Sequence, residues 1–202
     1  MSRLPWIIAL LAVAASIGLM LGRHQQAASA PAFRSLLSYA QARTLSDFEL
    51  STSPSGRLNK ARLQGRYSIL FFGFTHCPDV CPTALGVLRD TEKLLGAAAD
   101  QINFVFVSVD PERDDLNALG NYAKFFSARL LAATGPDAAL LPFTRELGVL
   151  YFKQAPVAGE YSVDHSAQFV VLDRQVRVIG IIRPPHDPAA IADDLRRLLG
   201  SQ

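Results

Sequence analysis

The sequence predicts an α/β protein: a mixed central sheet with helices on both faces, preceded by one transmembrane helix. Two observations predict the domain. Short, continuously apolar segments alternate along the chain with segments of helical period, and only a tight turn separates the last two apolar segments. A third observation, an uncharged apolar run at the start of the chain, predicts the membrane helix. The expected order of elements is β-α-β-α-β-α-β-β-α.

The N-terminal apolar run, Leu4–Gly22, contains 19 residues and no charge. As a helix it would span about 28 Å, close to the thickness of a bilayer core. A cleaved signal peptide is the alternative, because Ala28-Ser-Ala30 has the small residues of a cleavage site; however, signal peptides usually have a shorter apolar core, and Pro31 is expected to hinder cleavage. Arg3 and the terminal amine favour a cytoplasmic N-terminus. We therefore expect an uncleaved anchor that places the rest of the chain outside the cytoplasm.

The remaining chain predicts a tether and a single domain. We expect a membrane anchor over residues 1–22, a tether over residues 23–44 that is partly helical through Phe33–Tyr39, and one domain over residues 45–202. Charged residues make up 19% of the chain and the formal net charge is +2, too small to indicate binding of nucleic acid. With two cysteines the chain has no disulfide scaffold, so its stability comes from core burial.

The first three elements of the domain lead to the cysteines. Apolar and polar residues alternate in Leu45–Ser51, which predicts a half-buried strand, and Ser53-Pro-Ser-Gly56 predicts a turn. Tyr67–Phe74 is continuously apolar, which is typical of a strand covered on both faces. Residues 81 to about 99 follow a helical period. The side chains expected to reach the core from this helix are Leu85, Leu88, Leu94 and Leu95.

Two further strand and helix pairs follow. Ile102–Val109 predicts a second buried strand, and Asp110-Pro-Glu-Arg-Asp-Asp115 leads into a helix that ends near Ser127. Leu130–Thr134 is a short apolar strand, and Ala138–Leu147 predicts another helix.

The last elements are a hairpin and a helix. Gln168–Asp173 and Val176–Arg183 predict two antiparallel strands around a tight Arg174-Gln175 turn. Asp187-Pro188 supplies an N-cap followed by proline at the first helical position, and the helix runs through Leu199.

The chemistry of the chain is concentrated at its only two cysteines, Cys77 and Cys81, which lie four apart where a buried strand breaks into a turn. The helix that starts near Cys81 favours a thiolate there, the form that binds metals and attacks disulfides. The pair can therefore hold a metal ion or form one redox-active disulfide, and both remain open from these residues alone. Simple packing of two small side chains is disfavoured, because both cysteines flank one turn.

A third ligand for a metal is sought among the four histidines. His24 and His186 are expected in solvated loops, and the side chain of His76 is expected to point away from Cys77. His165 lies in a polar cluster immediately before an apolar strand, where a loop end can reach the end of a neighbouring strand. Two thiolates and one imidazole are a soft, incomplete set that suits Cu(I), whereas structural zinc takes four protein ligands. Asp164 is either a partner that orients the imidazole or a surface carboxylate.

Three stretches in order resemble the Sco/SenC family: Phe72-Gly-Phe-Thr-His-Cys-Pro-Asp-Val-Cys-Pro82, Val107-Ser-Val-Asp-Pro-Glu-Arg-Asp114 and Val163-Asp-His-Ser166. The resemblance covers most of the chain from about residue 45. It implies a thioredoxin-like fold on a membrane anchor, a copper cofactor bound by Cys77, Cys81 and His165, and a role in assembling the dinuclear copper A centre of cytochrome c oxidase subunit II. It also implies that the domain faces the periplasm or the mitochondrial intermembrane space. Because the absence of further cysteines agrees with a bacterial-type member, we expect a single-pass protein of the bacterial inner membrane with its domain in the periplasm.

The resemblance leaves more than one function open. The first is a metallochaperone that takes copper from an upstream donor and passes it to the oxidase subunit. The second is a thiol-disulfide oxidoreductase, itself kept reduced by an upstream thiol reductant, that reduces the copper-ligand cysteines of the partner. Whether the chain is an enzyme depends on which of these prevails. A peroxidase is disfavoured, since Pro78 stands where such enzymes have threonine, and a copper or redox sensor remains open.

Overall fold

The computed structural model describes Trp6 and residues 33–156 and 161–200. The residues from Phe33 onward form one compact unit, so this unit begins before residue 45, where the domain was expected to start. Apart from Trp6, the predicted membrane segment lies outside the described residues, as does the alternative cleavage site. Within the described parts of the chain, no helix combines the length and the apolar character needed to cross a bilayer.

The domain is built on a mixed sheet whose three central strands are parallel. These are β4, β5 and β6, and the strands on either side of them run antiparallel. The predicted mixed sheet is therefore confirmed. The strands, in spatial order, are β1 (Leu36–Thr44), β10 (Arg177–Ile182), β9 (Phe169–Leu172), β4 (Tyr67–Gly73), β5 (Ile102–Ser108), β6 (Leu130–Thr134), β2 (Leu50–Thr52) and β3 (Arg57–Leu58).

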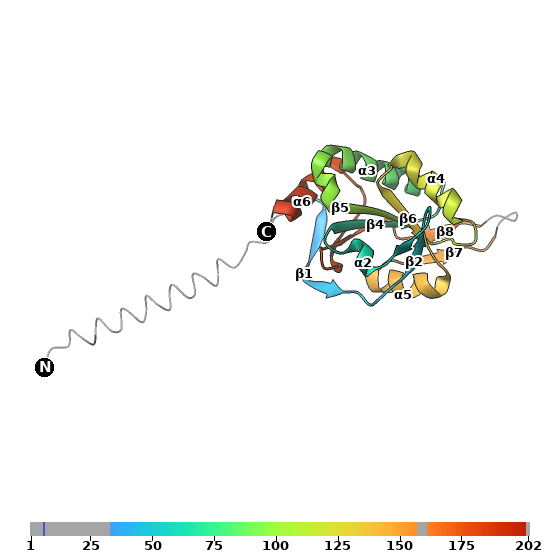
Figure 1. Cartoon of the computed structure of the whole chain (residues 1–202), viewed down its shortest axis with the longest axis horizontal. Coiled ribbons are helices and arrows are strands. Elements are labelled where there is room, and N and C mark those ends of the chain that lie inside the picture. The colour runs from blue at the N-terminus through green and yellow to red at the C-terminus, as the bar shows by residue number, and fades with distance from the viewer. Residues whose placement is uncertain (1–5, 7–32, 157–160, 201–202) are drawn as a thin grey trace. The chain divides into compact units, whose positions relative to one another are not determined.

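Helices cover both faces of the sheet, as predicted (Figure 1). The helices α3 and α4 lie on one side of the sheet and α5 on the other, and α3 packs against α6. Because both faces are covered, Phe71, Phe72 and Phe106 on adjacent central strands are all completely buried. The helices are α2 (Lys60–Leu63), α3 (Val80–Leu95), α4 (Leu116–Phe126), α5 (Asp137–Leu147) and α6 (Pro188–Gly200), and a 3₁₀ helix η1 (Gly96–Gln101) follows α3.

Aspartate side chains cap the starts of α4 and α6, and the cap at α6 is the one that the sequence predicted. The carboxylate of Asp115 accepts hydrogen bonds from the backbone N–H groups of Asn117 and Ala118 at the start of α4. At the start of α6 the Asp187 side chain accepts from Ala189 N–H. Of the core contacts predicted for α3, Leu85, Leu88 and Leu95 are buried, whereas Leu94 is 48% exposed. The prediction for Leu94 is wrong because neighbouring residues on a helix point about 100° apart, so only one of this pair faces the sheet.

The tether prediction is wrong for residues 36–44, and so is the partial helix over Phe33–Tyr39. Strand β1 occupies Leu36–Thr44 and pairs antiparallel with β10 at the edge of the sheet. Within β1 only Leu36 is buried, so the strand carries almost no apolar alternation that would reveal it. Its position is fixed instead by pairing with a strand more than a hundred residues away.

Four further strands differ from the prediction or were not predicted, among them the two-residue β3. Strand β2, Leu50–Thr52, overlaps only the end of the expected strand over residues 45–51. Strands β7 (Tyr151–Lys153) and β8 (Val163–His165) form a separate two-stranded antiparallel sheet, in which Tyr151 pairs with His165. Each is only three residues long, too short for a periodic signal. Strand β8 ends with the histidine that the sequence singled out.

Candidate metal centre

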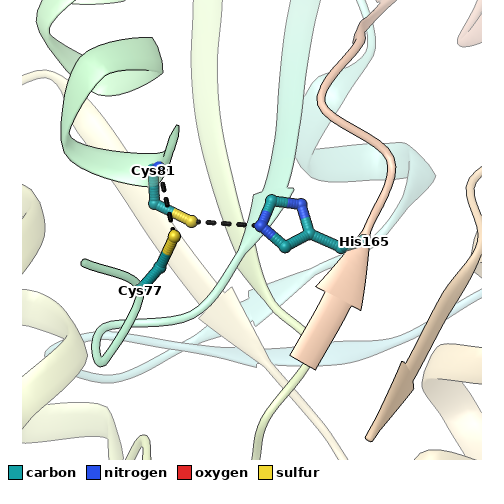
Figure 2. Close-up of side chains that lie close together, drawn as sticks. All are labelled: Cys77, Cys81 and His165. Carbon is teal, nitrogen blue, oxygen red and sulfur yellow. Dashed lines mark hydrogen bonds between the residues drawn. The ribbon is translucent and has the colours of Figure 1, made fainter. Parts of the chain in front are cut away.

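The cysteines lie in the turn that joins β4 to α3. The backbone N–H of Cys77 donates to Phe74 O at 3.3 Å, which closes the turn. The helix α3 begins at Val80, so the backbone N–H of Cys81 lies in the first turn of the helix, where it has no partner within the helix. It donates instead to Cys77 Sγ at 3.3 Å. Figure 2 shows the consequence: the two sulfurs lie next to each other although they come from a loop and a helix.

Cys81 is completely buried, and Cys77 is partly buried. Burial raises the pKa of the Cys81 thiol well above its ordinary value, and the neighbouring Cys77 and Asp114 raise it further, while a hydrogen bond to the Phe74 backbone acts in the opposite direction. The sequence predicted a thiolate here from the helix N-terminus. That expectation is wrong for Cys81 on its own, because desolvation of the sulfur outweighs the favourable helix end.

Gly73, the last residue of β4, lies directly behind the Cys81 sulfur. A Cβ atom at this position would lie 2.5 Å from Cys81 Sγ and 3.2 Å from the rings of Phe71 and Phe106. These contacts are too close to accommodate, so any side chain at residue 73 would displace the sulfur. The glycine therefore allows the helix to bring Cys81 against the sheet.

His165 approaches the sulfurs from the opposite side, at the end of β8 (Figure 2). Its Nε2 lies 3.3 Å from Cys81 Sγ, and its Nδ1 lies 3.2 Å from the carbonyl oxygen of Ser166. Because a carbonyl only accepts, Nδ1 carries the proton, and the lone pair of Nε2 faces the sulfurs. The imidazole ring packs edge-on against Phe71 and Phe74, with ring centroids 5.9 Å apart in each case.

Burial favours the neutral form of this imidazole. Desolvation lowers the pKa of His165, although the Ser166 carbonyl and the Asp164 carboxylate favour the charged form. Asp164 does not orient the ring. Its carboxylate accepts from Gln154 Nε2 at 2.6 Å, and adjacent residues of a strand point to opposite faces. The carbonyl of Ser166 takes the role that the sequence offered to Asp164.

The structure thus brings together the three side chains that the sequence proposed. The ligand atoms of Cys77, Cys81 and His165 all lie within 4.8 Å of one another, and the described residues contain no other group of three such side chains at this spacing. Of the remaining histidines, His76 places Nδ1 3.1 Å from Thr75 Oγ1, and the ring of His186 stacks on Phe169 with centroids 4.0 Å apart. His24 lies outside the described residues.

The spacing of the three ligand atoms suits one small metal ion. Metal–sulfur and metal–nitrogen bonds of roughly 2.3 and 2.0 Å place trigonal ligand atoms about 4 Å apart. The separation of 3.3 Å between Cys81 Sγ and His165 Nε2 and the upper limit of 4.8 Å for the group bracket that distance. Small movements of the side chains are therefore enough to accommodate an ion.

Comparison with known proteins identifies a family. A model described as SCO1/SenC matches residues 38–200. Protein SCO1 homolog 1, mitochondrial, of Arabidopsis thaliana is 32% identical over 147 residues, which are 72% of this chain and 44% of that protein. The chain also matches 55% of the Danio rerio protein SCO2 homolog, mitochondrial. It therefore spans about half the length of these curated relatives.

Solved structures share the fold. The solution structure of apo Sco1 from Thermus thermophilus matches with a TM-score of 0.73 and 35% sequence identity, covering 85% of this chain and 99% of that chain. The structure of Bradyrhizobium japonicum ScoI with copper bound matches with a TM-score of 0.71 and 32% identity, covering 76% of this chain and 99% of that chain. The domain has the thioredoxin-like fold of these proteins, and with the match of the family model over most of its length the chain belongs to the SCO1/SenC family.

Proposed function

We propose that this chain is a copper metallochaperone that holds one copper ion through Cys77, Cys81 and His165. Its cargo would go to the dinuclear copper A centre of cytochrome c oxidase subunit II. The observation that carries the proposal is the convergence of two sulfurs and an unprotonated imidazole nitrogen within 4.8 Å. Soft sulfur ligands with one imidazole favour Cu(I) over harder ions, and solved Sco structures of the same fold have copper bound.

Three protein ligands suit delivery better than permanent storage. A trigonal ion can accept a sulfur from an incoming partner before its own ligands leave. Cys77, which is only partly buried, is the ligand sulfur that a partner reaches more readily, whereas Cys81 is completely buried. Ligand exchange would therefore begin on the Cys77 side of the site.

The cellular setting is part of the same proposal. The 19-residue uncharged run at the N-terminus would anchor the chain in the bacterial inner membrane by a single helix, with the domain in the periplasm. There it would receive copper from an upstream donor and meet the periplasmic part of the oxidase subunit.

A second function, reduction of the partner's disulfide, is favoured by the contact of the Cys81 backbone N–H with Cys77 Sγ at 3.3 Å. Cys77 is also the more accessible of the two sulfurs. As a thiolate, Cys77 would attack a disulfide of the oxidase subunit, forming a mixed disulfide and releasing one partner thiolate. Cys81 would then pass its thiol proton to the partner thiolate already released and attack Cys77 Sγ, which releases the second partner thiolate and leaves a Cys77–Cys81 disulfide. Two electrons pass to the partner, and an upstream thiol reductant restores the pair.

The two functions are separated by a transfer experiment. We expect that the full-length chain loaded with one equivalent of Cu(I), mixed with the reduced, metal-free soluble domain of oxidase subunit II, loses copper to that domain. The measurement is the copper content of the two proteins after they are separated. In a parallel arm, the reduced chain without copper is mixed with the disulfide form of the same domain, and partner thiols are counted.

Copper in the partner fraction supports the metallochaperone. If copper stays with the chain while the partner disulfide is reduced in the parallel arm, the oxidoreductase is the correct function and the proposal of copper delivery is wrong.

A further inference from the structure

The segment Asp110–Asp114 follows β5. It contacts both the turn that carries the two cysteines and the residues that lead into β8, the strand that carries His165. Asp114 is completely buried. Its carboxylate accepts hydrogen bonds from Thr75 N–H at 2.9 Å, Thr75 Oγ1 at 2.5 Å and Ser108 Oγ at 2.6 Å. Thr75 is two residues before Cys77. One end of the segment therefore holds the cysteine turn against the end of β5.

The other contacts of the segment reach the strand that carries His165. Asp110, also completely buried, accepts from Tyr161 OH at 2.7 Å and from Arg113 Nε at 2.5 Å. Arg113 Nη1 donates to the Tyr161 carbonyl oxygen at 2.9 Å. Tyr161 is two residues before β8 begins at Val163. The side chain of Arg113 thus connects Tyr161, just before β8, to Asp110, just after β5.

Ring contacts and an ion pair strengthen this connection. The Arg113 guanidinium carbon lies 3.7 Å from the centroid of the Tyr161 ring and 5.5 Å from that of Phe74, and Phe74 packs against the His165 imidazole. Lys153 of β7 pairs with Glu112 at 2.7 Å. Both strands of the small sheet are therefore attached to the same segment, Lys153 through Glu112 and Tyr161 through Asp110 and Arg113.

We propose that Arg113, together with Asp110 and Tyr161, is a positioning group that holds His165 at binding distance from the two cysteine sulfurs. The proposal rests on the proposed function and deepens it, because it states what fixes the third ligand. β7 and β8 hydrogen-bond to each other rather than to the central sheet, so the direction of His165 depends on side-chain contacts. Arginine is required because Nε and Nη1 serve two different acceptors at once, a geometry that a single ammonium does not reproduce.

Two measurements on the full-length chain, purified in a mild detergent, test the proposal. The first is the affinity for Cu(I) of wild type, Arg113→Gln, His165→Ala and the double variant, measured by competition with a chromophoric Cu(I) chelator. Loss of a residue that orients a metal ligand commonly lowers metal affinity about 10-fold to 100-fold, and we expect this loss for Arg113→Gln. In the double variant we expect little further loss beyond His165→Ala, because Arg113 acts through that ligand.

The second measurement is amide hydrogen exchange of residues 161–166 without copper. We expect faster exchange in Arg113→Gln than in wild type. The matched control is Arg177→Gln, which removes another arginine paired with a largely buried aspartate, Asp173, at 2.7 Å in the β9–β10 turn. It should leave copper affinity and the exchange of residues 161–166 unchanged. If Arg113→Gln does not fold, Tyr161→Phe removes only the hydroxyl bond to Asp110, and we expect about fivefold weaker copper binding.

Equal copper affinity in wild type and Arg113→Gln would overturn the proposal. The proposal would also be overturned if the losses of copper affinity in Arg113→Gln and His165→Ala multiply in the double variant. It would be overturned as well if amide hydrogen exchange of residues 161–166 is the same in Arg113→Gln and wild type. A wild-type chain that binds no copper would instead defeat the proposed function, and the exchange measurement would still decide whether Arg113 holds β8.

Discussion

Replacement of Cys81 by serine is expected to weaken Cu(I) binding on the order of a thousandfold. Cys81 supplies one of only two soft ligands at the site, and a hydroxyl oxygen is a poor ligand for Cu(I). The substitution is nearly isosteric, so the hydrogen bond from the backbone of residue 81 to Cys77 Sγ, 3.3 Å in the native chain, is retained. The loss can therefore be assigned to the sulfur itself. Competition with a chromophoric Cu(I) chelator measures it.

The matched control for this variant is Val80→Ser. It introduces the same side chain one position earlier, at a residue that is 46% exposed, and should leave Cu(I) affinity unchanged. If Cys81→Ser binds copper as tightly as the wild-type chain does, the metal is held elsewhere and the proposed site is wrong.

The second large effect is expected at Asp194 of α6, where Asp194→Asn should lower the free energy of unfolding by about 3 kcal/mol. The carboxylate of this residue is buried. It accepts hydrogen bonds from the backbone N–H groups of Arg34, Ser35 and Leu36 and from the Ser35 hydroxyl, at 2.7–3.0 Å. Oδ2 accepts from all of these donors, whereas Oδ1 accepts only from Arg34 N–H. An asparagine loses the negative charge that strengthens these bonds and turns its NH₂ group toward Arg34 N–H, so the attachment of residues 34–36 to α6 is weakened.

The measurement is urea unfolding of the compact unit, residues 33–202, and the matched control is Asp193→Asn. The Asp193 side chain is 43% exposed and pairs with Arg34 and Arg196 at the surface, so its substitution should change stability by less than about 1 kcal/mol. Equal effects of the two substitutions would show that the hydrogen bonds to Asp194 do not hold β1.

The same carboxylate gives a pH dependence. Burial alone would raise the pKa of Asp194, but the hydrogen bonds from residues 34–36 outweigh it and hold the pKa below its usual value. The stability that Asp194 contributes is therefore fully present above its unfolded pKa of about 3.9 and is lost as the pH falls through the lower folded value. The difference in stability between wild type and Asp194→Asn should shrink over that acidic range.

The sequence predicted the elements that bury most of their residues. Strand β4 and strand β5 are continuous apolar runs because helices cover them on both sides, and that burial leaves a signal in composition. The edge strand β1 buries only Leu36, and β7 and β8 are too short for any period. Their positions depend on pairing between distant parts of the chain, which local patterns do not report.

At the candidate metal centre, too, some residues could be predicted from the sequence and others could not. The cysteine pair and His165 could be singled out because their chemistry is rare in this chain and because the motifs around them resemble a family. The residues that place them could not be assigned. Gly73 matters only because its missing Cβ leaves room for Cys81 Sγ, and Arg113 only because the fold brings it against Tyr161. The thiolate expected at Cys81 also failed for this reason, since the depth of burial depends on the whole fold.

The central claim is that one copper ion is held by two sulfurs and one imidazole nitrogen. The most direct measurement is the X-ray absorption spectrum of the reduced, full-length chain loaded with one equivalent of Cu(I). The account predicts that one copper ion is retained per chain, with two sulfur neighbours and one nitrogen neighbour. Failure to retain copper, or a bound ion with fewer than two sulfurs or without nitrogen, would contradict it.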